Sequence, residues 1–251
     1  MTANERTFTT RTATRHQPSK ILMIVANPAE LKGFPVGFFA EELTRAYLMF
    51  TEAGHSVDIA SPQGGPTRFD AHSDPRTPGT PYADDLISLG FINHPRLSAA
   101  IAETLPISTI TVADYDAVWV AGGGAPLVRF ADDAALHTLL ADFYEAGKVT
   151  SLICHGSSLL LWARTSDGRL VAEGKRWTGY SDAEEEAANQ AAGITLSDYT
   201  IESEAAKIPN TQFISGAPDE AFAIRDGRLI TGQQQYSSAI TAQLVLEALD
   251  E

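Results

Sequence analysis

Short apolar runs alternate with stretches of helical periodicity along most of this chain. Residues 20–26 are almost wholly apolar and end at Asn27-Pro28, which is typical of a strand buried on both faces. We expect further strands at residues 55–60, 117–121 and 149–153, helices at residues 38–53, 133–146, 182–192 and 237–249, and the start of another helix at residues 157–163. This alternation predicts an α/β fold, with a mostly parallel sheet covered by helices on both faces.

Three segments depart from this alternation. Residues 222–230 carry Asp226-Gly227 between two alternating runs, which predicts a β-hairpin. Residues 61–107 hold seven prolines, so we expect an insertion with short helices beside the sheet, suited to act as a lid or interface. Residues 1–18 are rich in Thr and Arg and predict a disordered tail before a single α/β domain over residues 19–251.

The charge of the chain limits the choice of partner. Eighteen Lys and Arg residues face 32 Asp and Glu residues, a formal net charge of −14. Such a surface repels phosphate backbones and anionic lipid headgroups, so we expect neither nucleic acid nor a membrane as a partner. The single cysteine, Cys154, excludes an internal disulfide framework and fits a cytoplasmic protein.

Cys154 is the strongest candidate for chemistry. The apolar run at residues 149–153 leads directly into Cys154-His155-Gly156, and a helix is expected to start within two residues. A strand, a tight turn and a helix in this order form a nucleophile elbow, which presents one side chain at the carboxyl edge of the sheet. The helix N-terminus would lower the pKa of the thiol. The alternative is a small apolar residue in the core, but the polar residues and glycine that follow favour the elbow.

A nucleophilic thiol needs a base, an orienting group and donors for an oxyanion. His155 is the adjacent base candidate, unless it only faces solvent. Gly122, Gly123 and Gly124 follow a predicted strand and can offer backbone N–H groups, or can form a plain loop. Acidic residues at Glu41-Glu42 and at residues 184–186 are candidates for the carboxylate, although acidic runs are usually solvated helix faces. Asp70, His72 and Asp74 match no strong metal-ligand template, so we expect no metal site.

Several motifs in their order along the chain resemble the ThiJ/PfpI superfamily. They are residues 37–43, 53–65, 120–123, Ile153-Cys-His-Gly156, residues 174–186 and residues 229–233. The resemblance is greatest to the branch that holds glutathione-independent glyoxalase III and heat-shock holding chaperones. It implies the class I glutamine amidotransferase-like fold, a flavodoxin-like three-layer sandwich with a nucleophile elbow.

The resemblance also implies roles for individual residues. Cys154 becomes the nucleophile, His155 its partner, Glu41 the buried acid against the thiol, and Glu185 the carboxylate that orients His155. Glu42 and Glu184 become their solvated neighbours. This chain departs from the branch at Gly124-Ala125-Pro126, where a histidine followed by glycine is usual.

The implied activity is a cofactor-free conversion of methylglyoxal or a related 2-oxoaldehyde into a 2-hydroxy acid, D-lactate, through a hemithioacetal on Cys154. Backbone N–H groups near Gly123 and His155 would hold the oxyanion. The alternatives are a cysteine-dependent deglycase, amidase or hydratase acting on another small electrophile, and a stress-related holding chaperone. We expect a homodimer from the same resemblance.

Overall fold

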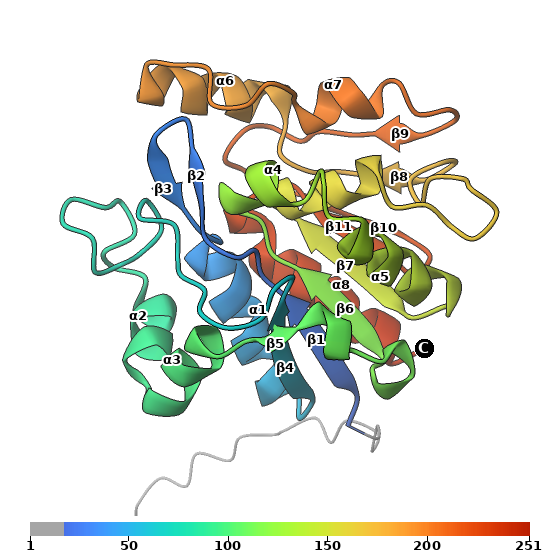
Figure 1. Cartoon of the computed structure of the whole chain (residues 1–251), viewed down its shortest axis with the longest axis horizontal. Helices are drawn as coiled ribbons and strands as arrows, with labels where there is room; N and C mark the ends of the chain where they lie inside the picture. Colours follow the sequence, from blue (N-terminus) through green and yellow to red (C-terminus); the bar gives the residue numbers. More distant parts are fainter. Residues whose placement is uncertain (1–17) are drawn as a thin grey trace, which may run out of the picture.

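The computed structural model describes residues 18–251, and its centre is a sheet (Figure 1). The strands are β1 (Lys20–Ile24), β2 (Ala29–Leu31), β3 (Phe34–Val36), β4 (Ser56–Ser61), β5 (Leu105–Pro106), β6 (Ala117–Val120), β7 (Val149–Ile153), β8 (Arg176–Trp177), β9 (Gln212–Phe213), β10 (Ala223–Asp226) and β11 (Leu229–Gly232). The predicted tail falls largely on residues 1–17, which lie outside the described residues.

Within residues 18–251 the main sheet has seven strands in the order β10-β11-β7-β6-β1-β4-β5. All neighbouring pairs in it are parallel except β10 and β11. From β1 the chain builds to one side through β4, then returns to add β6 and β7 on the other. The order therefore reverses between β1 and β6, and ligands of open α/β sheets bind outside the carboxyl ends of the strands at such a point.

Helices lie on both faces of the sheet and beyond the carboxyl ends of its strands. They are α1 (Ala40–Glu52), α2 (Leu86–Asn93), α3 (Pro95–Ala102), α4 (Ala125–Arg129), α5 (Ala134–Glu145), α6 (Asp182–Ala192), α7 (Ile201–Ala205) and α8 (Ser238–Leu249), with 3₁₀ helices η1 (Ile107–Thr109), η2 (Val112–Asp114), η3 (Cys154–Leu161) and η4 (Gln235–Ser237). In β1, Ile21 and Met23 pack in the core under α1 and α8, whereas Leu22 and Ile24 pack in the core under α5. The predicted flavodoxin-like three-layer arrangement is thereby confirmed.

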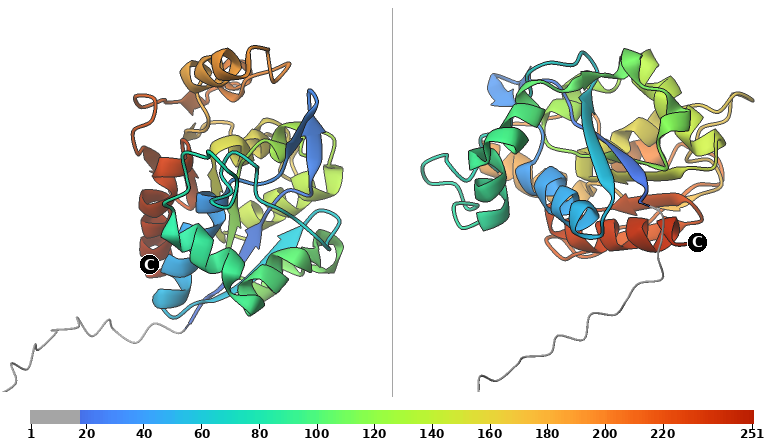
Figure 2. Two further views of the ribbon diagram at one scale, coloured as in Figure 1. Left: turned by 90° about the vertical axis from the view of Figure 1, so that its left-hand side faces the viewer. Right: turned by 90° about the horizontal axis from the view of Figure 1, so that it is seen from below.

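Two of these helices lie beyond the carboxyl ends of the strands. Helices α6 and α7 sit above the carboxyl ends of the strands rather than on a face, as the orange ribbon in Figures 1 and 2 shows. The β2–β3 hairpin rises toward the same end of the molecule. Within residues 18–251, no helix is long and apolar enough to cross a lipid bilayer.

Several predicted boundaries are confirmed and others are corrected. The strand at residues 149–153 and the helix at residues 182–192 have the predicted limits. The segment at residues 61–107 carries the short helices α2 and α3, but Ser61 still belongs to β4 and Leu105–Pro106 form the edge strand β5. The insertion is therefore shorter than predicted. The prediction excluded a strand at Pro106, but an edge strand accommodates proline. The hairpin turns at Gly227-Arg228, one residue later than expected.

Candidate active site

Cys154 lies at the turn between β7 and η3. Its side chain is only 2% exposed, and its backbone φ is +56°, a left-handed conformation that residues other than glycine rarely adopt. A Cβ on Gly156 would lie 2.7 Å from the carbonyl oxygen of Val120, so only glycine lets the bend pack against β6. The predicted elbow is present, although its helix is 3₁₀ and begins at Cys154 itself.

Two backbone N–H groups donate to the Cys154 sulfur, one from Gly123 and one from His155. Both hydrogen bonds favour the thiolate. Burial nevertheless raises the pKa of the thiol well above its usual value, and the Glu42 carboxyl group raises it further when it is ionised. The prediction of a lowered thiol pKa is therefore wrong for this site, because desolvation of the sulfur outweighs its amide donors.

The acid beside the thiol is Glu42, not Glu41. Glu42 is fully buried in the first turn of α1, its Oε2 accepts the Gly122 N–H at 2.6 Å, and its carboxyl group hydrogen-bonds to Cys154. Glu41 lies one residue earlier, so it points about 100° away around the helix, where it pairs with Arg45 at 3.3 Å. The predicted position of Glu41 against the thiol and of Glu42 in solvent is therefore wrong.

Burial raises the pKa of Glu42 to about 8, although the hydrogen bonds from Cys154 and Gly122 lower it. Glu42 is thus predominantly protonated at neutral pH. A protonated carboxyl group adds no negative charge beside the sulfur and can donate a hydrogen bond to it. The pair can share one proton between carboxyl oxygen and sulfur.

His155 connects the thiol to α6. Its Nδ1 lies 3.9 Å from Cys154 Sγ and 3.1 Å from the Gly123 carbonyl oxygen, while its Nε2 lies 2.8 Å from Glu185 Oε1. Glu185 is 3% exposed, and the Tyr180 ring packs against the imidazole with centroids 4.3 Å apart. The structure therefore brings Cys154, His155 and Glu185 together in the arrangement that the resemblance implies.

Glu184 is buried as well, which corrects its prediction as a solvated residue. Its carboxyl oxygens accept hydrogen bonds from Ser181, from the Gln233 amide at 3.0 Å and from the Asp219 N–H. Ser181 caps α6 in return by accepting the Glu184 N–H. Glu184 thus fixes the first turn of the helix that carries Glu185.

The three glycines after β6 lie at the site, as predicted: Gly122, Gly123 and Gly124. The last of them, Gly124, donates its N–H to the carboxyl group of Asp70. Asp70 is 8% exposed, and its carboxyl oxygens accept the Gly37 N–H at 2.5 Å and the Gly124 N–H at 2.7 Å. In the sequence, Asp70 is noticed only as a possible metal ligand, at a place where no metal site is expected. Among residues 18–251 no group of three or more His, Cys, Asp or Glu side chains is placed to hold a metal ion.

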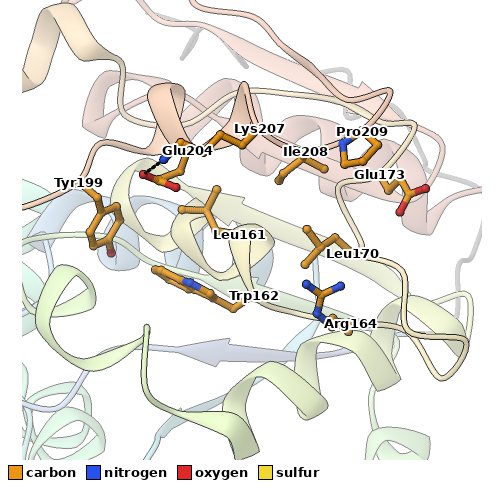
Figure 3. A pocket seen from close by; sticks show the side chains of 10 residues that line it. All are labelled: Leu161, Trp162, Arg164, Leu170, Glu173, Tyr199, Glu204, Lys207, Ile208 and Pro209. Carbon is orange, nitrogen blue, oxygen red and sulfur yellow. Dashed lines mark hydrogen bonds and ion pairs between the residues drawn. The ribbon is translucent and has the colours of Figure 1, made fainter.

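A separate hollow of about 590 Å³ lies at the far end of η3 (Figure 3). Trp162, Leu161 and Leu170 form apolar parts of its wall, and a Lys207–Glu204 ion pair stands at its rim. None of the predicted site residues lines it. The predicted site residues lie instead around Cys154.

A family model described as the DJ-1/PfpI family matches residues 34–247. The curated protein "probable glutathione-independent glyoxalase hsp3103" of Schizosaccharomyces pombe is 31% identical over 240 residues, which cover 86% of this chain and 92% of that relative.

Two solved structures share the fold. Rapid encystment protein REP24 of Francisella tularensis has a TM-score of 0.82 at 21% identity, covering 92% of this chain and 99% of its own. Glyoxalase III from Candida albicans has a TM-score of 0.76 at 23% identity, covering 92% of this chain and 97% of its own.

Proposed function

Because this chain belongs to the DJ-1/PfpI family, we propose that it is a glutathione-independent glyoxalase that converts methylglyoxal or a related 2-oxoaldehyde into a 2-hydroxy acid such as D-lactate. The observation that carries the proposal is the set of groups around one sulfur. Cys154 has an acid on one side, an imidazole on the other, and two backbone N–H donors. Relatives named glutathione-independent glyoxalases support the substrate class.

The reaction begins with addition of the Cys154 sulfur to the aldehyde carbon. The thiol proton passes to the aldehyde oxygen, which gives a hemithioacetal. The Gly123 and His155 N–H groups, which point at the sulfur, stabilise negative charge that develops on that oxygen. No change of oxidation state occurs at sulfur in this step.

A proton then moves between the two carbons of the substrate. A base removes the proton from the former aldehyde carbon to give an enediol, and an acid returns a proton to the neighbouring carbon, which leaves a thioester of the 2-hydroxy acid. Water hydrolyses the thioester and regenerates the thiol, so that one water is consumed overall. We assign these proton transfers to Glu42 and His155, which both lie beside the sulfur.

Glu42 suits this exchange because its pKa of about 8 lies close to neutral pH. A group with such a pKa can both release and accept a proton during a cycle. His155 receives its orientation from Glu185, in the manner of the third member of a catalytic triad.

The test is incubation of purified protein with methylglyoxal in the absence of glutathione, followed by a stereospecific lactate assay. We expect the wild type to form D-lactate and the Cys154→Ser variant to form none above background, with an unchanged circular dichroism spectrum. A wild type that forms no lactate overturns the proposed substrate, and an active Cys154→Ser variant overturns the thiol mechanism.

The assembly is the second part of the proposal. We propose a homodimer, for which the exposed apolar side chains Leu86, Ile240 and Leu48 provide candidate contact area. Sedimentation equilibrium should give twice the chain mass of 26.9 kDa. A mass of 26.9 kDa across the micromolar range would contradict it.

A further inference from the structure

Three consecutive backbone N–H groups in the segment Gly122–Gly124 donate to three different acidic groups. Gly122 donates to Glu42 at 2.6 Å, Gly123 donates to the Cys154 sulfur, and Gly124 donates to Asp70 at 2.7 Å. The middle donor is the one that faces the reacting atom. Its direction depends on the hydrogen bonds of the peptide groups on either side.

The backbone of Gly123 does not by itself keep its N–H pointing at the sulfur. Its φ of +99° lies in a region that glycine enters readily and leaves readily. An added Cβ would meet Phe39 N at 2.5 Å and Asp70 Oδ2 at 2.6 Å, so the segment runs in close contact with both. The conformation is therefore imposed by neighbours, and Asp70 is the neighbour on the side away from Glu42.

We propose that Asp70 is a positioning residue for the reaction at Cys154, because its carboxyl group clamps Gly124 to Gly37 and thereby aims the Gly123 N–H at the sulfur. Its effect on turnover rests on the proposed function, but its effect on the sulfur does not. The hydrogen bonds of the Asp70 carboxyl group go to Gly37 and Gly124 and not to Cys154. It acts through the glycine segment.

A carboxyl group is the side chain that this clamp requires. Oδ1 accepts from Gly37 at 2.5 Å and Oδ2 accepts from Gly124 at 2.7 Å, so both oxygens are used. The isosteric Asn has one oxygen and one NH₂, and it can accept from only one of the two amides with its carbonyl group. The other amide would face an NH₂ donor in a site where Asp70 is 8% exposed.

The same stretch of chain also fixes the helix that carries Glu42. Ser73 Oγ accepts the N–H of Ala40, the first residue of α1, at 2.9 Å, and donates to the Asp70 carbonyl oxygen at 3.2 Å. Phe39, the N-cap residue, makes no side-chain hydrogen bond to the helix. Ser73 thus serves as a cap supplied from outside the helix, and residues 70–73 link both sides of the thiol.

Alkylation of Cys154 by iodoacetamide measures the sulfur without any assumption about substrate. The chain has one cysteine, so mass spectrometry of the intact protein reports this site alone. For Asp70→Asn we expect the curve of alkylation rate against pH to move to higher pH, with a rate at pH 8 at least fivefold below that of the wild type, because a misdirected Gly123 N–H stabilises the thiolate less. With methylglyoxal, kcat should fall about tenfold while KM stays within twofold.

Asp226→Asn is the matched control. Asp226 also uses both carboxyl oxygens, which accept hydrogen bonds from Arg176 N at 3.0 Å and Lys175 Nζ at 3.4 Å. It lies at the end of β10 opposite Leu229, near the amino end of β7, whereas Cys154 follows the carboxyl end of that strand. We expect its alkylation curve and its kcat to match those of the wild type. If Asp70→Asn does not fold, Ser73→Ala removes the hydrogen bond from Ser73 Oγ to the Asp70 carbonyl oxygen and so loosens the position of Asp70. This variant should lower the alkylation rate at pH 8 at least twofold.

An Asp70→Asn or Ser73→Ala alkylation curve that coincides with the wild type would overturn the proposal. An equal shift in Asp226→Asn would overturn it too, since the effect would then reflect general loss of stability. A wild type that forms no lactate overturns the proposed function instead, and the alkylation comparison still decides the role of Asp70.

Discussion

Glu41 and Glu42 are adjacent in sequence but lie in different environments. Glu42 precedes Ala46 by four residues and Phe50 by eight, so it belongs to the buried stripe of α1, whereas Glu41 precedes Arg45 by four and belongs to its more exposed side. This spacing is visible in the sequence and could have identified the buried acid. The resemblance alone assigned the buried position to Glu41, because two identical neighbouring residues offer it no difference in side chain to align.

Replacing each of these glutamates by glutamine gives opposite expectations. Glu42→Gln removes the group that carries the proton beside Cys154, so we expect turnover of methylglyoxal to fall at least about 100-fold. Glu41→Gln only loses an i,i+4 pair with Arg45, so turnover should stay within threefold and stability within about 0.5 kcal/mol. Initial rates and urea unfolding of both variants measure this, and a larger loss in Glu41→Gln would restore Glu41 as the catalytic acid.

The raised pKa of Glu42 makes stability depend on pH. The ordinary pKa of a glutamate is 4.5, and that of Glu42 in the folded chain is about 8. At a pH between these two values, the folded chain keeps a proton on Glu42 that the unfolded chain releases. The unfolded state binds fewer protons there, so the free energy of unfolding falls as pH rises through this window. We expect wild type to lose roughly 2 to 5 kcal/mol from this group between pH 5 and pH 8.

Glu42→Gln supplies the comparison, because glutamine does not titrate. Its free energy of unfolding, measured in urea at pH 5 and pH 8, should lack this decrease, so that the difference between wild type and variant changes with pH. Parallel profiles for the two proteins would show that Glu42 is ionised in the folded chain at neutral pH.

Among the elements, α6 owes its position to acidic residues rather than to apolar ones. The two residues that α6 buries are Glu184 and Glu185. Glu184→Ala would leave donors from Ser181, Gln233 and Asp219 without their acceptor, so we expect a loss of roughly 2 kcal/mol in stability and a lower kcat through displacement of Glu185. Glu186→Ala is the control on the same helix, since Glu186 is exposed, and it should change neither.

The elements were predictable where periodicity alone determines them. The strand at Val149–Ile153 and the helix at Asp182–Ala192 follow directly from apolar runs and capping residues. The edge strand β5 was not predictable, because two residues including a proline carry no strand pattern and become a strand only by pairing with β4.

The site was predictable where its residues are neighbours in sequence, and much less so where they are not. Cys154 and His155 follow from the strand and turn that precede them, but the contact between Asp70 and Gly124 joins positions 54 residues apart. No local pattern marks such a contact. The buried state of Asp70 also reverses the usual expectation for an acid in a polar loop.

At the scale of the whole molecule, the site collects residues from several separate connections. Glu42 follows β1, the glycines follow β6 and Cys154 follows β7, which are adjacent strands on both sides of the reversal in strand order. Glu185 comes from α6, above the same edge (Figure 1). The sheet therefore fixes three of the four groups, and a helix outside its layers supplies the fourth.

This division has a consequence for heating. A helix anchored by buried carboxyl groups, away from both apolar cores, opens at a lower free-energy cost than the strands. We expect catalytic activity to disappear several degrees below the main unfolding transition, as followed by activity and far-ultraviolet circular dichroism on the same sample. Coincident transitions would contradict this. If the two transitions separate, the chain passes on heating through a state in which the sulfur and its acid remain in place while His155 has lost the carboxylate that orients it.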